Sequence, residues 1–209
     1  MSLGPGLRKA FFARDCRQVA AELIGCRLVR RLANGDRLIL RLVEVEAYLG
    51  DGSDPASHAH RGRTPRNQTM FGPAGRVYAY RSYGIHTCVN VVCGESGKAS
   101  AVLLRAGEPI VGASHMRKLR GLAKASSLEL IARGPGRLAQ ALGLELDDDG
   151  RSLLRAPLTL HQPDSSLQAP RVERGPRVGI TQAADLPYRF FEPESPWVSV
   201  FRSGHSKAR

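Results

Sequence analysis

The clearest pattern in the chain is the alternation of apolar and polar positions over residues 76–90. Tyr78 and Tyr80 share one face of the first half, as expected for a strand whose side chains alternate with a period of two. A second alternating segment follows Gly84, a residue that tolerates the positive φ of a tight turn. The pattern therefore predicts a β-hairpin with Tyr83 at its solvent-exposed tip, where an aromatic ring has no core to fill.

Similar patterns predict the other elements. Asp15 is a suitable N-cap for a short helix that is closed by Gly25. Two strands at 26–32 and 37–48 flank the turn signal Asn34-Gly35 and form a second hairpin. We also expect one helix that opens at Pro109 and another that follows the loop 134–137. Further strands are expected at 99–105, 151–160, 177–181 and 197–202.

The strand at 37–48 ends in two acidic residues. Its leucines lie at even positions such as Leu40 and Leu42, and the same parity continues into Glu44 and Glu46. Glu46 is the best candidate catalyst, because a carboxylate at the end of an apolar strand, partly shielded from water, is a suitable general base. Glu44 could be the acid instead. The alternative is a solvated glutamate at the end of a strand, paired with an arginine of the following loop.

Periodicity disappears between residues 50 and 75, a stretch rich in Gly, Pro, Arg and His. A loop of this length within a compact domain is usually either functional or disordered. The spacing of His58 and His60 could suit a metal, but no third ligand is evident nearby. A catalytic or base-contacting role is the other alternative, although a histidine in a loop is more often structural. The tyrosines of the neighbouring strands could belong to the core, or they could form the walls of a flat pocket.

Strands outnumber helices and are joined by hairpins, which indicates the α+β class. We expect a single domain over residues 1–209, in which a curved antiparallel sheet is flanked by helices and carries a protruding β-hairpin. The core should span about residues 7–201, followed by a flexible tail at 203–209. A chain of 209 residues that is 42% hydrophobic can bury one sizeable core.

Charge narrows the class of partner. The chain has 31 Lys and Arg against 19 Asp and Glu, a net charge of +12, which favours a phosphate backbone or an anionic membrane surface. No uncharged apolar run approaches the ~18–20 residues of a membrane span, and no secretory signal is evident, so we expect a cytoplasmic protein without a membrane partner. The four cysteines are too scattered for a zinc or iron–sulfur site, so we expect free thiols and neither a metal nor a cofactor.

Six motifs in chain order resemble those of the methylpurine (3-methyladenine, alkyladenine) DNA glycosylase family. Together they extend over roughly residues 7–201, nearly the whole chain. They are VEVEAYLG at 43–50, TPRN at 64–67 followed by Met70-Phe71, Tyr78-x-Tyr80-x-x-Tyr83-Gly84 with Cys88-Val-Asn90, LLRA at 103–106 with Glu108-Pro109, GPGRLxQAL at 134–142, and SPWVS at 195–199.

The resemblance implies a monofunctional base-excision repair enzyme that requires no cofactor. Such an enzyme flips alkylated or deaminated purines (3-methyladenine, 7-methylguanine, with hypoxanthine as a further candidate) out of double-stranded DNA and hydrolyses the N-glycosidic bond. Glu46 matches the general base that activates water, and Arg105 matches a residue beside that water and the phosphate of the flipped nucleotide. The resemblance is also consistent with a monomer associated with the nucleoid.

Other matches concern recognition of the base and of the duplex. Tyr83 corresponds to the intercalating residue that fills the gap left by the flipped nucleotide, and Asn90 to the residue that excludes normal guanine. The walls that sandwich the base are matched by Tyr48, His58 and Tyr80. The residues expected to contact DNA outside the pocket are Arg63, Thr64, Ile85, His86 and Arg137.

Two alternatives belong to other functional classes. A non-catalytic lesion-binding or RNA-binding module could use the same basic face and the same wedge, and it would tolerate the loss of Glu46. A formyl-transfer enzyme or another small-molecule enzyme on a similar antiparallel sheet would need neither the positive charge nor Tyr83.

Overall fold

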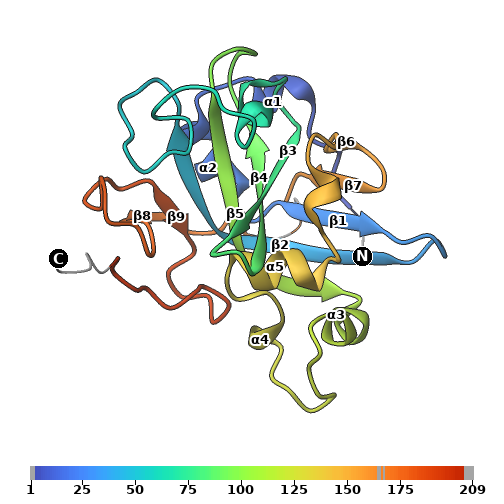
Figure 1. Ribbon diagram of the computed structural model, residues 1–209. Helices are drawn as coiled ribbons and strands as arrows, with labels where there is room; N and C mark the ends of the chain where they lie inside the picture. Colours follow the sequence, from blue (N-terminus) through green and yellow to red (C-terminus); the bar gives the residue numbers. More distant parts are fainter. Residues whose placement is uncertain (1–2, 164–165, 167, 205–209) are drawn as a thin grey trace.

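The computed structural model describes residues 3–163, 166 and 168–204, and the end of the predicted tail, residues 205–209, lies outside this part. An antiparallel sheet forms the centre of the molecule, with short helices around it (Figure 1). The helices are α1 (Lys9–Phe12), α2 (Cys16–Leu23), α3 (Ala113–Leu119), α4 (Glu129–Ala132) and α5 (Pro135–Ala141), with two 3-10 helices, η1 (Gln68–Phe71) and η2 (Leu146–Asp148).

The described strands form one sheet, and each pair in it is antiparallel. They are β1 (Arg27–Arg31), β2 (Arg37–Leu49), β3 (Val77–Ser82), β4 (His86–Val92), β5 (Ser100–Val111), β6 (Leu154–Arg155), β7 (Leu158–His161), β8 (Glu173–Gly175) and β9 (Arg189–Phe191). The order is β3-β4-β5-β2-β1-β7-β6, and β9 pairs with both β2 and β8. The predicted α+β class with a curved antiparallel sheet is confirmed.

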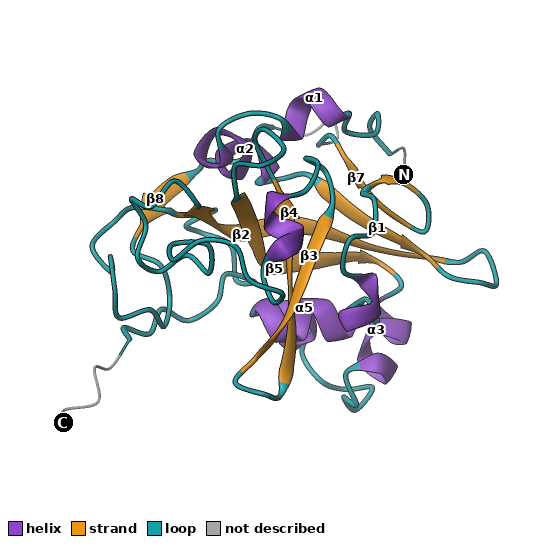
Figure 2. Cartoon of the chain, turned by 45° about the horizontal axis from the view of Figure 1, so that its top comes forward, coloured by secondary structure: helices purple, strands orange, loops and turns teal. Residues whose placement is uncertain are grey.

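The two predicted hairpins are present. β3 and β4 pair in register, with Tyr78 opposite Asn90, and Figure 2 shows this hairpin extending past α5. β1 and β2 form the other hairpin around Gly35, which has a φ of +88°. Helix α2 is capped as expected, because the Asp15 carboxylate accepts a hydrogen bond of 2.8 Å from the backbone N–H of Arg17.

The helix predicted to open at Pro109 is present as α3, but it begins later than predicted, at Ala113. Residues 109–111 instead complete β5, where Pro109 lies opposite Leu40 at a shift in register. Gly112, with a φ of +83°, then separates the strand from α3. Proline fits here because the irregular pairing removes the need for its missing N–H.

Two predicted strands near the C-terminus are wrong. Residues 177–181 and 197–202 form turns and extended segments outside the sheet, and the predicted strand 151–160 is divided into β6 and β7. In the first segment, the N–H of Val178 bonds to the Glu46 side chain and not to another strand. An apolar run can therefore pack against a sheet without joining its backbone hydrogen bonds.

Two compensating irregularities occur where β2 pairs with β5. The register gives β2 one extra residue at Val43 and gives β5 one extra residue at Arg105. A β-bulge of this kind bends the strand and changes which face its following side chains occupy. Beyond the bulge, β9 takes the place of β1 along the second edge of β2 and pairs with residues 44–46.

The bulge corrects the predicted parity of β2. Leu40 and Leu42 pack in the main core before it, whereas Val45 and Ala47 pack there after it. The even-numbered residues that follow, including Glu46, therefore point to the opposite face from the leucines. Sequence parity alone placed Glu44 and Glu46 on the leucine face. The sequence of β2 does not show that Val43 is left without a partner on β5, because this depends on the register between the two strands.

The loop between β2 and β3 is held to this opposite face by a second, smaller cluster of buried residues. The cluster includes Ala59 and Met70 from the loop, Tyr78 from β3 and Ala101 from β5.

No helix in the described part of the chain has the length and apolar character needed to cross a membrane. All four cysteines are free and buried, as predicted.

Gly50 makes the closest backbone contact at the start of this loop. A Cβ atom at this position would lie 1.8 Å from the carbonyl oxygen of Ala99. We expect Gly50→Ala to destabilise the fold by about 1–3 kcal/mol, which lowers the Tm by about 2–4 °C per kcal/mol for a domain of this size. Gly175→Ala is the control, since its Cβ would meet only Phe191 at 3.5 Å. Equal Tm values for the two variants would contradict this close packing.

Candidate active site

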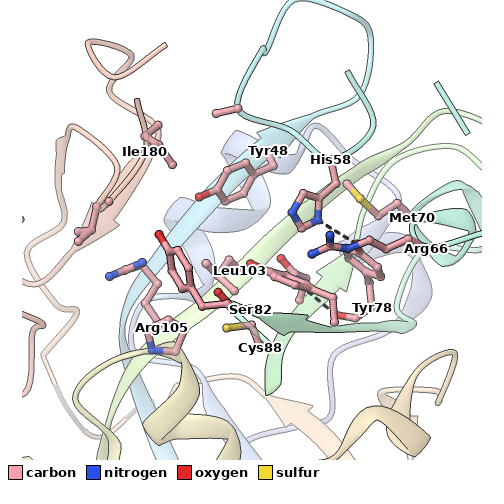
Figure 3. A pocket seen from close by; sticks show the side chains of 17 residues that line it. Tyr48, His58, Arg66, Met70, Tyr78, Ser82, Cys88, Leu103, Arg105 and Ile180 are labelled. Carbon is pink, nitrogen blue, oxygen red and sulfur yellow. Dashed lines mark hydrogen bonds between the residues drawn. The ribbon is translucent and has the colours of Figure 1, made fainter. Parts of the chain in front are cut away.

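A cavity of about 390 Å³ opens on the face of the sheet that lies opposite the leucine core. The even-numbered side chains of β2 point to this face after the bulge. The walls of the cavity come from β2, β5, the β3–β4 hairpin, the loop after β2 and the segment 178–180. The cavity brings together six residues that the sequence singled out: Tyr48, His58, Tyr80, Tyr83, Asn90 and Arg105. Figure 3 shows the side chains that line it.

Aromatic rings form much of the wall. Tyr48 projects from β2 and His58 from the following loop, and both reach into the same space in Figure 3. The His58 ring lies edge-on to Tyr80, with centroids 4.5 Å apart, and Tyr78 stacks on Tyr80 at 5.6 Å. Flat apolar faces with polar edges suit a planar heterocycle.

His58 is fixed by a neighbouring phenol. Its Nδ1 atom shares a hydrogen bond of 2.9 Å with the Tyr78 hydroxyl. His58 stays partly open to solvent, but the partial burial of its ring, together with the charge of Arg66, lowers the pKa of His58 from its ordinary value of 6.5. Burial raises the pKa of Tyr78 to about 12. The pair is therefore a neutral imidazole and a neutral phenol near pH 7.

Asn90 lies on the buried floor of the cavity. It sits opposite Tyr78 in the hairpin, and its side-chain amide donates a 3.0 Å hydrogen bond to the Tyr78 backbone carbonyl. Cys88 and Leu103 complete the floor around it. The bond restricts how the Asn90 side chain can move when the cavity is filled.

Glu46 lies directly behind this wall and is fully buried. Its Oε2 accepts hydrogen bonds from the Tyr48 hydroxyl (2.8 Å) and from Arg105 Nη1 (3.3 Å), and its Oε1 accepts one from the N–H of Val178 (2.7 Å). Tyr48, Arg105 and Val178 all line the cavity. Two side chains and one backbone N–H of the cavity lining thus hold the carboxylate at the edge of the open space.

Glu44 is also fully buried, but its environment differs from that of Glu46. It accepts hydrogen bonds from Arg105 Nε (3.1 Å), Arg189 Nε (2.7 Å) and both the N–H and the hydroxyl of Ser199 (2.8 and 2.9 Å). These four donors make Glu44 an acceptor in a fixed network. Glu44 therefore holds Arg105 in place, and Arg105 in turn holds Glu46.

The tip of the hairpin is a strained two-residue turn. Tyr83 and Gly84 both have positive φ values, +50° and +71°, and the N–H of Ile85 bonds to the Ser82 carbonyl at 3.0 Å. Tyr83 is 87% exposed, so no core packing compensates for a left-handed conformation that bulky residues disfavour. Strain held at an exposed aromatic residue is typical of a functional position.

The predicted DNA-contacting residues lie around the cavity, not in its wall. Thr64 lines a neighbouring hollow with His58, and the Arg63 guanidinium lies 4.7 Å from the Phe71 ring centroid. Ile85 is exposed at the hairpin tip. The other two come together where the hairpin meets α5: His86 packs against Gly136, the residue before Arg137.

Several residues at the site were not predicted from the sequence. Val178, Gly179 and Ile180 line the cavity from a segment that resembled a strand. Arg66 and Met70 line it from the loop, where the sequence motifs included them without assigning them a role. TPRN and Met70-Phe71 are among the quoted motifs, which could have identified the loop residues. The alternation of residues gave no sign that the 178–180 segment lies beside Glu46.

Comparisons with known proteins agree on one family. The family model described as methylpurine-DNA glycosylase matches residues 10–196. A protein of Rhodopseudomonas palustris, provisionally named a 3-methyladenine DNA glycosylase, is 51% identical over 198 residues, which is 95% of this chain and 90% of its own. Relatives with the same provisional name in Methanoculleus marisnigri and Nocardia farcinica are each 50% identical, with 92% and 84% of this chain and 98% and 84% of their own chains covered.

Relief of the strain at the hairpin tip should increase the free energy of unfolding. We expect Tyr83→Asn to stabilise the fold by about 1 kcal/mol, because asparagine tolerates positive φ and Asn-Gly is the preferred pair for such a turn. Thermal unfolding should show a higher Tm. Ile85→Asn is the control, since it removes an apolar side chain that is 69% exposed without relieving the turn, and its Tm should not rise. A lower Tm for Tyr83→Asn would show that the ring stabilises the turn.

The lowered pKa of His58 predicts a pH dependence of stability. The unfolded chain binds the proton more tightly than the folded chain, so His58 contributes stability above its ordinary pKa of 6.5, and this stability is lost as pH falls through the lower folded value. The Tm should therefore fall more steeply below about pH 6.5 in the wild type than in His58→Gln. The control variant His115→Gln changes a histidine of α3 that does not line the cavity, and it should keep the wild-type slope. Parallel curves for all three proteins would exclude this contribution.

Proposed function

The chain belongs to the methylpurine-DNA glycosylase family of DNA repair enzymes, and we propose that it excises alkylated and deaminated purines from duplex DNA. The proposed substrates are 3-methyladenine and 7-methylguanine, with hypoxanthine as a further candidate. The observation that carries the proposal is the aromatic-walled cavity with the Glu46 carboxylate directly behind its wall.

The cavity has the features needed to receive a flipped base. Tyr48, His58 and Tyr80 provide flat faces, and an N-methylated purine that carries positive charge is attracted to such faces by about 0.5–2 kcal/mol. That is too little to separate damaged from normal bases by itself. The charged purine is also a better leaving group. The buried Asn90 on the floor would clash with the 2-amino group of normal guanine. 7-Methylguanine has the same 2-amino group, and it would be excised despite this clash because its positive charge weakens the N-glycosidic bond.

Extrusion of the base requires something to occupy the gap in the stack. Tyr83 is suited to this role because it is exposed at the end of a protruding hairpin, with Ile85 beside it. Arg137 at α5 and Arg63 and Thr64 in the loop would bind the flanking phosphates. A net charge of +12 supports such contacts.

Hydrolysis would proceed at Glu46. In the proposed step, a water molecule attacks C1′ of the sugar from the face opposite the base and passes a proton to the Glu46 carboxylate, and the electrons of the N-glycosidic bond leave with the base. The negative charge of Glu46 also stabilises the oxocarbenium-like transition state. Its hydrogen bonds to Arg105 and to the N–H of Val178 support this role, because they hold the carboxylate at the cavity wall.

The expected product is an abasic site in an intact strand. Cleavage of the strand by a glycosylase usually proceeds through a Schiff base with an amine. No lysine occurs among the described residues that line the cavity. We therefore propose that the enzyme hydrolyses the N-glycosidic bond and leaves the sugar–phosphate backbone uncut.

Removal of the proposed base tests the mechanism directly. Glu46→Gln should reduce single-turnover release of base from methylated duplex DNA by at least about 10²–10⁴-fold, the usual contribution of a general base, with duplex affinity close to wild type. Glu95→Gln, at an exposed acid paired with Lys98, is the control and should keep full activity. All reactions should contain a chelator. Full activity in Glu46→Gln would place the base elsewhere, and tight binding without release by the wild type would favour a binding module.

A further inference from the structure

A buried ion pair lies behind the aromatic wall of the cavity, outside the residues discussed above. Arg177 donates to both oxygens of Asp54, at 2.6 and 2.7 Å, and neither side chain is exposed. Burial opposes the charge on Arg177, but the hydrogen bonds and charge of Asp54 raise the pKa of Arg177 overall. The two residues are far apart in sequence, so the pair joins two separate segments.

The guanidinium also contacts the strand that carries Glu46. Its Nη1 donates to the carbonyl of Ala47 at 3.0 Å, between Glu46 and Tyr48. Its central carbon lies 4.6 Å from the centroid of the Tyr48 ring. Tyr48 is thus supported by a cation on one side and donates its hydroxyl to Glu46.

Asp54 fixes the loop that carries His58. Its oxygens accept backbone hydrogen bonds from Leu49 (3.1 Å) and Ala56 (3.2 Å), which sets the path of the chain as it leaves β2. The carbonyl of Asp54 accepts a further bond from the N–H of Ser57, the residue before His58. On the other side of the pair, Val178 follows Arg177 and donates its N–H to Glu46.

Stability alone does not account for this arrangement. A buried ion pair usually stabilises a fold no more than apolar residues of similar volume would. The Arg177 Nε atom is buried without a hydrogen-bond partner in the described structure, which adds to the cost. The pair makes hydrogen bonds to three fixed backbone positions and presents a flat cation to Tyr48. A pair of apolar side chains could do neither.

We propose that Arg177 and Asp54 form a positioning pair, which sets the spacing between the aromatic wall and the Glu46 carboxylate. One ion pair fixes Tyr48, the approach to His58 and the N–H that binds Glu46. The inference rests on the proposed glycosylase function, because it concerns the geometry of that reaction. A displacement of about 1 Å in such a site can reduce the rate about 100-fold.

The test compares variants that remove one cation and one anion each. Arg177→Met with Asp54→Asn removes the positioning pair. Arg41→Met with Glu108→Gln removes a partly buried pair between β2 and β5 on the other side of the bulge, together with the contact of Arg41 to Glu192. Each is assayed for Tm, for single-turnover base release at saturating enzyme, and for affinity to a duplex with a tetrahydrofuran abasic analogue, which has no base to sandwich. We expect the first variant to lose about 100-fold in release, with its affinity for the analogue within about threefold. The control variant Arg41→Met/Glu108→Gln should have a lower Tm than the wild type, without a comparable decrease in the rate of base release.

A second variant keeps the test decisive if the first does not fold. Arg177→Lys retains the charge but not the planar fork, so release should fall to an intermediate value while the protein remains folded. A folded Arg177→Met/Asp54→Asn protein, or a folded Arg177→Lys protein, with wild-type release would overturn the inference. Failure of the wild type itself to release base would instead contradict the proposed function.

Discussion

The site depends on the paired bulges between β2 and β5. The extra residue at Val43 turns Glu44 and Glu46 away from the leucine core, and the extra residue on β5 is Arg105, which contacts both carboxylates. At the same point β9 replaces β1 as the neighbour of β2 and brings Arg189 opposite Glu46. Two neighbouring irregularities in pairing thus turn the end of a central core strand into the back wall of a cavity.

Turning acidic residues into a buried layer requires compensation, because an isolated buried charge is very costly. The layer behind the cavity supplies three carboxylates and three guanidiniums, each nine-tenths or more buried and each in at least one ion pair. They are Glu44, Glu46, Asp54, Arg105, Arg177 and Arg189. Their formal charges cancel, so the wall can hold a fixed carboxylate near the cavity without an uncompensated charge in the core.

Local pattern was sufficient for much of the fold and for part of the site. The alternation in the hairpin predicted the shared face of Tyr78 and Tyr80 and the exposed Tyr83, because strand geometry fixes these directly. It could not predict the bulge, which depends on the partner strand. Arg177 was also missed: a basic residue normally favours solvent, and only Asp54, far away in the chain, makes its burial possible.

The wedge and the cavity meet opposite physical demands. A side chain that enters a base stack must be exposed beforehand, so Tyr83 gains no packing energy and its turn retains the strain. A cavity that discriminates between similar bases must instead be rigid before the base arrives, since ordering its walls on binding would reduce the difference in affinity. The chain separates these demands in space. The hairpin carries the strained residue outside the sheet, while the buried ion pairs fix the cavity from behind.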